Sequence, residues 1–311
     1  MIQFNDLVTI IIRTSQEKRL PLLKNALLSV VANDYRPIEI IIVIQSEKQD
    51  FIDYLQNMSN EYSDKQVQVR IFINYTSKDQ RAKNLNIGVN NANGRYIGFL
   101  DDDDVFYKHH IASLVEKLNN SESVAWAYSQ VAMSICTLDK EKVNIVSLNY
   151  PFQKDKFTVK EMLKDNFIPI HSYLIDRNKC NLDCIYFDES FPVMEDYEFL
   201  LRLLHRGYPT FINEVTCEYR FYIKPSNSSS NLDAYSILDH REIENAKIWL
   251  ETGERIEKTK KKLYPEYTSG LISTNKRKFL LSNFSFLNII KKKLPNLWKL
   301  IKYLASVIQL I

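Results

Sequence analysis

The sequence predicts an α/β fold with a mostly parallel sheet flanked by helices, and three observations lead to this prediction. Four short apolar segments, rich in β-branched residues, recur within the first hundred residues. A stretch with helical spacing lies between each apolar segment and the next. Most of the apolar segments lack polar alternation, which is typical of strands buried on both faces of a parallel sheet.

The elements of this first part follow one another in strand–helix order. The predicted strands are Leu7–Arg13, Ile38–Ile44, Val67–Ile73 and Tyr96–Leu100. The predicted helices are Leu20–Asn33, Phe51–Glu61 and Gln80–Asn91. The third strand alternates between apolar and polar residues, so we expect it nearer an edge of the sheet.

The second part of the chain is less regular. It has predicted strands at Val124–Ser134, Tyr173–Ile175 and Cys217–Tyr222, and a polar loop at Lys224–Asn231. Its predicted helices are Val159–Asp165, Glu195–Arg206 and Asp233–Thr252. A glycine, Gly207, follows the second of these helices and suits its end.

Length and composition favour one large domain with an appendage. The chain has 311 residues, of which 45% are hydrophobic and 25% charged. The cysteines are few and unevenly spaced, and Cys180 and Cys184 lack the second pair that a zinc site needs. We therefore expect reduced core thiols in a cytosolic protein. The N-terminal residues lack the basic region of a signal peptide, and no window is apolar enough to span a membrane.

The charge is divided between an acidic body and a basic tail. The whole chain carries +3, and residues 267–311 contain eight bases and no acid. Subtracting eight from +3 leaves −5 for residues 1–266. Beyond Pro295, which suits a helix start, a polar face with Lys299 and Lys302 alternates with an apolar face that includes Trp298. This pattern predicts an interfacial membrane anchor, and Lys291–Lys293 would be attracted to anionic lipid. The alternative is a helix that packs on the body or on a partner subunit.

Four consecutive aspartates, Asp101 to Asp104, follow the fourth predicted strand directly. In parallel sheets ligands bind outside the carboxyl ends of the strands, so this position predicts a site. Mg²⁺ typically takes one or two protein carboxylates together with phosphate oxygens. Asp101 and Asp103 would share one such ion beside a diphosphate, and Asp102 would point elsewhere, toward a sugar hydroxyl. The alternative is a solvated acidic surface loop.

The order of the motifs resembles a family 2 glycosyltransferase of the GT-A fold, over roughly residues 6–222. The first strand ends at Ile12–Thr14, and a later helix reads RAKNLNIGVNNANG over Arg81–Gly94. The aspartate-x-aspartate signature is present as Asp101–Asp103. Much later come a glutamate–aspartate pair within Met194–Tyr197 and the Tyr219–Arg220 pair.

The resemblance implies inverting transfer of a sugar from a nucleoside-diphosphate sugar, with UDP expected, and a divalent cation, Mn²⁺ or Mg²⁺. The acceptor would be a hydroxyl of a glycan or a lipid-linked molecule in cell-surface polysaccharide biosynthesis. Asp196 would be the general base, and Glu195 would hold the acceptor or orient Asp196. Both acids also suit the first turn of a helix, where the dipole stabilises negative charge, without any catalytic role.

The same resemblance implies that several other residues contact the donor. They are Thr14, Gln45, Arg81, Lys83, Asp101 and Asp102. His171 either lines the acceptor pocket or is structural, and His109 and His110 are expected to begin a helix rather than to bind metal.

Two residues depart from the family pattern. Gln45 stands where an aspartate usually pairs with the nucleotide base; its amide can donate and accept but carries no charge, so the base stays open. Arg13 replaces a common proline and is either a phosphate contact or a salt-bridged surface residue.

The implied organisation is a catalytic domain over residues 1–252 and a basic helical extension over residues 253–311. The nucleotide-sugar half would span about 1–104 and the acceptor half about 105–252. The enzyme would be cytoplasmic and peripheral on the inner face of the cell membrane.

Three other classes of protein are compatible with parts of the sequence. A nucleotidyltransferase usually has a Gly-rich basic loop after the first strand, but Thr14–Leu22 contains no glycine. The presence of Asp101, Asp103 and Asp196 disfavours a catalytically inactive protein that binds a sugar or a partner. Gln45, in place of the usual aspartate, leaves this alternative in consideration. Nucleic-acid binding would use the basic tail, but the apolar face of the tail suits lipid better.

Overall fold

The structure is a computed structural model that describes residues 6–180, 185–223 and 242–268. The chain divides into two compact units, which are described separately. The first unit is Met1–Val131 with Ile168–Tyr219, and the second is Ala132–Phe167 with Arg220–Ile311. The predicted loop Lys224–Asn231, Cys184 and the predicted tail helix lie outside the described residues.

Parallel strands form the first half of the sheet in the first unit. They are β1 (Val8–Thr14), β2 (Ile38–Gln45), β3 (Val67–Asn74) and β4 (Tyr96–Asp101), in the spatial order β3-β2-β1-β4. All four predicted strands are confirmed to within one residue at either end. Every residue of β2 is buried, whereas β3 alternates at its start and lies at the edge of the sheet, as its sequence predicts.

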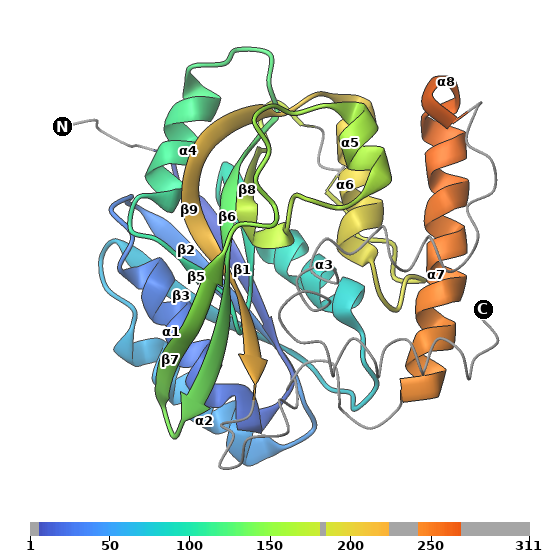
Figure 1. Ribbon diagram of the computed structural model, residues 1–311. Helices are drawn as coiled ribbons and strands as arrows, with labels where there is room; N and C mark the ends of the chain where they lie inside the picture. The colour runs from blue at the N-terminus through green and yellow to red at the C-terminus, as the bar shows by residue number, and fades with distance from the viewer. Residues whose placement is uncertain (1–5, 181–184, 224–241, 269–311) are drawn as a thin grey trace. The chain divides into compact units, whose positions relative to one another are not determined.

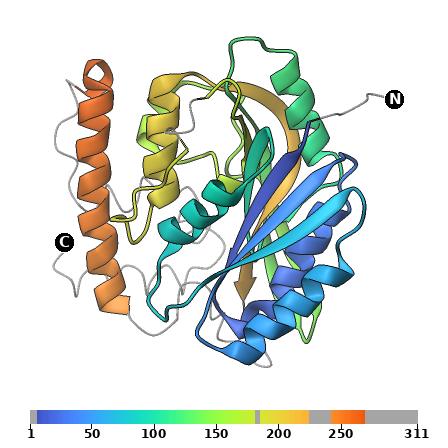
Figure 2. The ribbon, with the colours of Figure 1, turned by 180° about the vertical axis from the view of Figure 1, so that it is seen from behind.

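The helices that follow these strands are the predicted ones. After β1 come a short 3-10 turn, η1 (Glu17–Arg19), and α1 (Leu20–Val31); α2 (Gln49–Glu61) follows β2, and α3 (Arg81–Asn91) follows β3. The chain moves outward from β1 to β3 and then returns to place β4 on the other side of β1. Because such crossovers are right-handed, α1 and α2 cover one face of the sheet and α3 covers the other (Figures 1 and 2).

The strands β1 and β4 therefore form a topological switch point. The connections that leave β1 and enter β4 run to opposite faces of the sheet, and in α/β folds ligands bind in the crevice expected above the carboxyl ends of such a pair. The parallel register sets Arg13 of β1 directly beside Asp101 of β4. The polar ends of both strands are thus brought together by the sheet itself.

Antiparallel strands form the other half of the sheet. They are β8 (Tyr173–Asp176), β6 (Trp126–Asp139), β9 (Thr210–Ile223) and β5 (Val105–Phe106), in the order β4-β8-β6-β9-β5. The pairs β4–β8, β6–β8 and β5–β9 are all antiparallel. The α/β prediction is confirmed, and the sheet is a mixed one with a parallel half and an antiparallel half.

Two further helices of this unit are α4 (His110–Asn119) and α6 (Glu195–Arg206), and a 3-10 turn, η2 (Ile170–Ser172), precedes β8. An aromatic cluster holds α6 on the sheet. Phe99 of β4 meets Phe187 edge to face at 5.2 Å between ring centroids, and Phe187 stacks on Phe199 of α6 at 4.4 Å. This packing places the first turn of α6 beside the end of β4. Gly207 ends the helix in an extended conformation rather than a left-handed one.

The second unit contains the continuation of β6 and its hairpin partner β7 (Lys142–Asn149), which the sequence did not predict. It also contains α5 (Val159–Lys164), α7 (Glu242–Leu263) and α8 (Pro265–Thr268). The predicted end of α7 at Thr252 is wrong, because Thr252, Ile256 and Lys260 form a buried stripe that carries the helix on to Leu263. Residue 252, the predicted domain boundary, lies inside this helix, and the division into domains stays a prediction.

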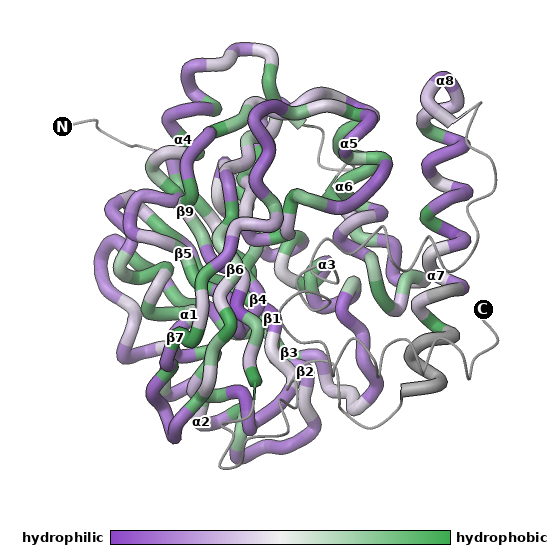
Figure 3. The backbone as a smooth tube through the Cα atoms, viewed as in Figure 1, coloured by the Kyte–Doolittle hydropathy of each residue, from purple (hydrophilic) through white to green (hydrophobic). Residues whose placement is uncertain are grey.

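Amphipathic patterning accounts for the helices in both units. The colour of α4 alternates between hydrophobic and hydrophilic along its length (Figure 3), and its buried residues include Ile111, Leu114 and Leu118. Within the described residues, no helix combines the length and the apolar character needed to cross a membrane.

One close contact fixes α3 on β1 and supplies a test of this packing. A Cβ atom added at Gly88 of α3 would lie 2.3 Å from Cγ2 of Ile11. We expect Gly88→Ala to lower the free energy of unfolding by about 2 kcal/mol, measured by urea denaturation, because the added methyl overpacks the core. In the double variant with Ile11→Ala the combined loss should be smaller than the sum of the single losses. Additive losses would contradict the contact.

Candidate active site

The four aspartates lie where β4 ends and the chain turns. Asp101 is the last residue of β4, and the N–H of Asp104 donates to the carbonyl of Asp101 at 3.2 Å, which closes the turn. Asp102 and Asp104 are buried, whereas Asp101 and Asp103 are partly exposed. Like charges at this spacing repel one another, so the turn depends on cations around it.

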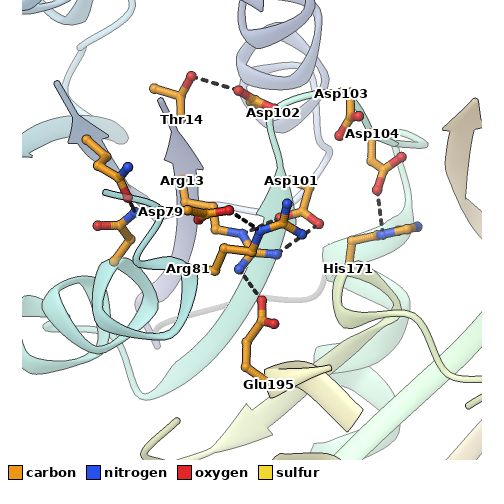
Figure 4. A network of polar contacts seen from close by, with 12 residues as sticks. Arg13, Thr14, Asp79, Arg81, Asp101, Asp102, Asp103, Asp104, His171 and Glu195 are labelled. Carbon is orange, nitrogen blue, oxygen red and sulfur yellow. Dashed lines mark hydrogen bonds and ion pairs between the residues drawn. The ribbon is translucent and has the colours of Figure 1, made fainter. Parts of the chain in front are cut away.

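Arg13 is the cation that meets Asp101 (Figure 4). Its Nε donates to Asp101 Oδ1 at 2.8 Å, and its Nη1 donates to Glu195 Oε1 at 2.5 Å. Burial raises the pKa of Asp101, but the Arg13 guanidinium outweighs burial, so the net shift is downward. Arg13 is thus salt-bridged, but within the site rather than on the surface, and its contact with a phosphate stays a prediction.

Arg19, at the end of η1, meets the next two aspartates. Its Nε and Nη2 donate to Asp102 Oδ1 at 2.9 and 2.5 Å, and Nη2 also lies 2.7 Å from Asp103 Oδ2. The hydroxyl of Thr14 donates to the other oxygen of Asp102 at 2.7 Å. Asp102, predicted to meet a sugar hydroxyl, is therefore anchored to Thr14 and Arg19 in this structure.

Asp103 carries charge that its surroundings do not fully compensate. Burial raises its pKa, the Arg19 guanidinium lowers it, and the neighbouring aspartates raise it, with a net result of about 7. The ionised form of Asp103 is therefore disfavoured by its surroundings, and a further cation beside it would stabilise that form.

The predicted metal ligands, Asp101 and Asp103, fit a hard divalent cation by their chemistry. Their side chains are 28% and 20% exposed, and carboxylate oxygens are the donors that such ions prefer. Within residues 6–180, 185–223 and 242–268, no three His, Cys, Asp or Glu side chains are arranged to hold an ion on their own. An ion here would need additional oxygen atoms from a bound ligand, and the structure pairs both carboxylates with arginine.

The fourth aspartate is held by a histidine. His171 Nδ1, from η2, lies 2.9 Å from Asp104 Oδ2, and both side chains are almost fully buried. Burial lowers the pKa of His171, but Asp104 outweighs burial and the net shift is well upward, which favours the charged imidazolium. The ring of Tyr219 stacks on His171 at 6.0 Å. His171 thus supports the aspartate turn.

The acidic pair at the start of α6 faces the same arginine. Met194, immediately before it, has a left-handed backbone with φ of 60°, a conformation that non-glycine residues rarely adopt. Glu195 is buried against Arg13. Burial and the neighbouring Glu195 raise the pKa of Asp196 to about 6, despite the opposing effect of Arg13. A partly buried carboxyl with a pKa near neutrality suits proton transfer.

Gln45 takes part in a buried amide network. Its Oε1 accepts from the backbone N–H of Gln80 at 3.0 Å and from Asn84 Nδ2 at 2.8 Å. Asn74 Nδ2 donates to Asn84 Oδ1 at 2.8 Å. The network ties the ends of β2 and β3 to the start of α3, so the side-chain acceptor of Gln45 is engaged within the protein. Contact with a base through Gln45 stays a prediction.

The two cations predicted at the start of α3 are placed differently from each other. Arg81 is exposed and pairs through Nε with Asp79 at 3.1 Å, and Lys83 is half-buried. The charge of Arg81 also helps to lower the pKa of Asp101. His110 begins α4 as expected, with His109 as its N-cap residue.

Sequence reasoning missed two contributors to the site. It gave Arg19 no role, although the KR pair of η1 follows β1 closely enough to reach the switch point. It also did not pair Asp104 with His171, because 67 positions separate them and no local pattern links them.

The chain belongs to glycosyl transferase family 2. The family model matches residues 9–177, more than half of the 311 residues, and this segment contains Arg13, Arg19 and all four aspartates. The family predicted from the order of motifs is thereby confirmed.

Two curated relatives resemble part of the chain. A glycosyltransferase of Rickettsia conorii is 25% identical over 209 residues, 64% of this chain and 32% of the relative. A GalNAc(5)-diNAcBac-PP-undecaprenol beta-1,3-glucosyltransferase of Campylobacter jejuni is 28% identical over 120 residues, 39% of this chain and 35% of the relative. The chain spans about a third of the length of each.

Solved structures share the fold. S. aureus TarS 1-349 in complex with UDP-GlcNAc has a TM-score of 0.53 at 11% identity, covering 85% of this chain and 73% of that one. The mannosyltransferase PcManGT from Pyrobaculum calidifontis, in complex with GDP-Man and Mn²⁺, has a TM-score of 0.56 at 14% identity, covering 98% and 81%. The predicted GT-A fold is confirmed.

The central role of Arg13 can be tested by stability. We expect Arg13→Ala to lower the free energy of unfolding by about 3 kcal/mol, because it leaves Glu195 buried and unpaired beside Asp101. Arg13→Lys should lower the free energy of unfolding by less, because it keeps the positive charge. Urea denaturation at neutral pH measures both. Equal losses in the two variants would show that charge at this position is unimportant.

Proposed function

We propose that the protein is an inverting glycosyltransferase that moves a sugar from a nucleoside-diphosphate sugar to an acceptor hydroxyl. One observation carries the proposal. At the topological switch point, Arg13 joins Asp101 at the end of β4 to Glu195 at the start of α6. The acids that we propose for donor binding and for acceptor activation are thereby held close together, and the reacting sugar would lie beside them.

Donor binding would use the aspartate turn. A divalent cation, Mn²⁺ or Mg²⁺, would supply charge neutralisation to the departing diphosphate when held by Asp101 and Asp103. Thr14 and Asp102 would line the nucleotide side of the crevice, and Arg81 and Lys83 would face it from α3. The proposed donor is a UDP-sugar, supported by the fold shared with TarS in complex with UDP-GlcNAc. The shared fold of PcManGT with GDP-Man makes GDP the first alternative to test.

Transfer would use Asp196 as the general base. Its carboxylate accepts the proton of the acceptor hydroxyl while the hydroxyl oxygen forms a bond to the anomeric carbon. The bond from that carbon to the diphosphate oxygen breaks, and its electron pair leaves with the diphosphate. Burial of Asp196 beside Glu195 strengthens it as a base, because both raise its pKa. Glu195, held by Arg13, would orient the acceptor or Asp196.

The proposed acceptor is a hydroxyl of a glycan or of a lipid-linked molecule in cell-surface polysaccharide biosynthesis. The name of the C. jejuni relative, which includes an undecaprenol-linked substrate, supports this proposal. The basic tail would bring the enzyme to the membrane surface that carries such an acceptor, on the cytoplasmic side.

Nucleotide binding tests the donor site first. In calorimetric titrations with UDP, GDP and CDP, each with and without Mn²⁺, we expect UDP to bind most tightly and only with the metal. Asp103→Ala should remove the metal-dependent part of the affinity, because it deletes one proposed ligand. Asp53→Ala, at an exposed position of α2, is the matched control and should change nothing. A folded wild-type protein that binds no nucleotide would favour the inactive binding protein.

The pH dependence of turnover tests Asp196. A base must be ionised, so kcat/KM should fall about tenfold per pH unit below an apparent pKa of about 6. Asp196→Asn should lower kcat by a factor of about 10² to 10⁴ while leaving the affinity for UDP unchanged. A wild-type profile that stays flat down to pH 5 would remove Asp196 from this role.

Membrane association tests the tail. Truncation before Phe284 removes Lys291–Lys293 and the amphipathic segment after Pro295. We expect the full chain, but not the truncated one, to float with vesicles that contain anionic lipid, because the lysines and apolar residues act together. Equal flotation of both proteins would exclude the tail as the anchor.

A further inference from the structure

We propose that Arg19 is a ligand for the diphosphate of the nucleotide donor, an inference that rests on the proposed function. The observation behind it is a guanidinium that is fixed on one side and open on the other. Two aspartates hold one edge of Arg19 in place, and its remaining donors have no protein acceptor among the described residues.

The contacts of Arg19 are uneven. Nε and Nη2 both donate to Asp102 Oδ1, and Nη2 also contacts Asp103 Oδ2. Within the described part of the chain, Nη1 has no hydrogen bond or ion pair, and the side chain is 25% exposed. The planar guanidinium presents its donors in a fixed fork, so an edge held by carboxylates leaves a second edge oriented for another anion.

The anchors of Arg19 place it at the switch point. Asp102 accepts from Thr14 at the end of β1, and Asp102 itself follows the end of β4. Arg19 is therefore tied to the carboxyl ends of both strands that frame the crevice. A diphosphate that enters this crevice meets the open edge of a guanidinium whose position is already set.

The other three cations of the site do not combine a fixed position with open donors. Arg13 uses Nε, Nη1 and Nη2 on Asp101 and Glu195. His171 is enclosed with Asp104. Arg81 is 47% exposed and pairs with the exposed Asp79. Of these four cations, Arg19 alone is both held in place and equipped with open donors.

Local structure gives an independent reason to assign Arg19 a binding role. It occupies the N-cap position of α1, where the positive end of the helix dipole disfavours a cation. A point charge such as lysine would be enough to neutralise Asp102 and Asp103. A guanidinium is needed where carboxylates and phosphate oxygens are to be contacted together.

The experiment compares uridine, UMP and UDP as probes, titrated by calorimetry in excess Mg²⁺. In Arg19→Gln we expect uridine binding to be unchanged, UMP binding to be weakened slightly and UDP binding to be weakened by about tenfold or more. Lys18→Gln, on the same turn, removes the same charge from an exposed position and should leave all three affinities within about twofold. Thermal unfolding establishes that each variant is folded.

A second variant keeps the test decisive if Arg19→Gln is unstable. Arg19→Lys retains the charge beside Asp102 and Asp103 but cannot reach phosphate at the same time, so it too should lose affinity for UDP more than for UMP. Equal loss for all three probes, or no loss for UDP, would overturn the proposal and leave Arg19 as a counter-ion of the aspartates. Wild-type protein that binds none of the probes would overturn the proposed function and this inference together.

Discussion

The structure of the site depends on the repulsion among four carboxylates at the end of one strand. Asp101 to Asp104 lie in a single tight turn, and two of them are buried. Each is matched by a cation from another part of the chain: Arg13 from β1, Arg19 from η1 and His171 from η2. The compensation is incomplete at Asp103, whose pKa stays near 7. A further cation beside Asp103 would stabilise its ionised form.

The fold supplies these cations through register and packing. Parallel pairing sets Arg13 beside Asp101, and the aromatic cluster of Phe99, Phe187 and Phe199 brings the start of α6 to the same place. The buried amides of Gln45 and Asn84 fix α3 above the sheet. Strands and helices therefore hold the residues of the candidate site in place, which is the condition for pre-organised binding.

The sequence was sufficient wherever the signal was local. Buried parallel strands are recognisable in a sequence as apolar runs, so β1 to β4 could be predicted, and with them the position of the site at Asp101. The strand β7 is mostly exposed, so its apolar residues Ile145, Val146 and Leu148 do not mark a buried face. The sequence of α7 after Thr252 is largely polar, so its buried stripe could not be recognised from composition. Arg19 and His171 join the site through contacts that only the tertiary structure creates. The catalytic roles proposed for Glu195 and Asp196 come from the family resemblance. From the sequence alone, both would be acids in the first turn of a helix, which are common.

The bridge made by Arg13 also bears on how the sequence can change during evolution. One side chain neutralises Asp101 in the proposed donor half and Glu195 in the proposed acceptor half, and these positions lie 94 residues apart in the chain. Where homologous chains carry proline in place of Arg13, Glu195 requires a different counter-ion or a neutral replacement. Substitutions at positions 13 and 195 should therefore occur together. A branch of the family in which both residues differ would connect the proposed donor and acceptor halves through another ion pair or contact.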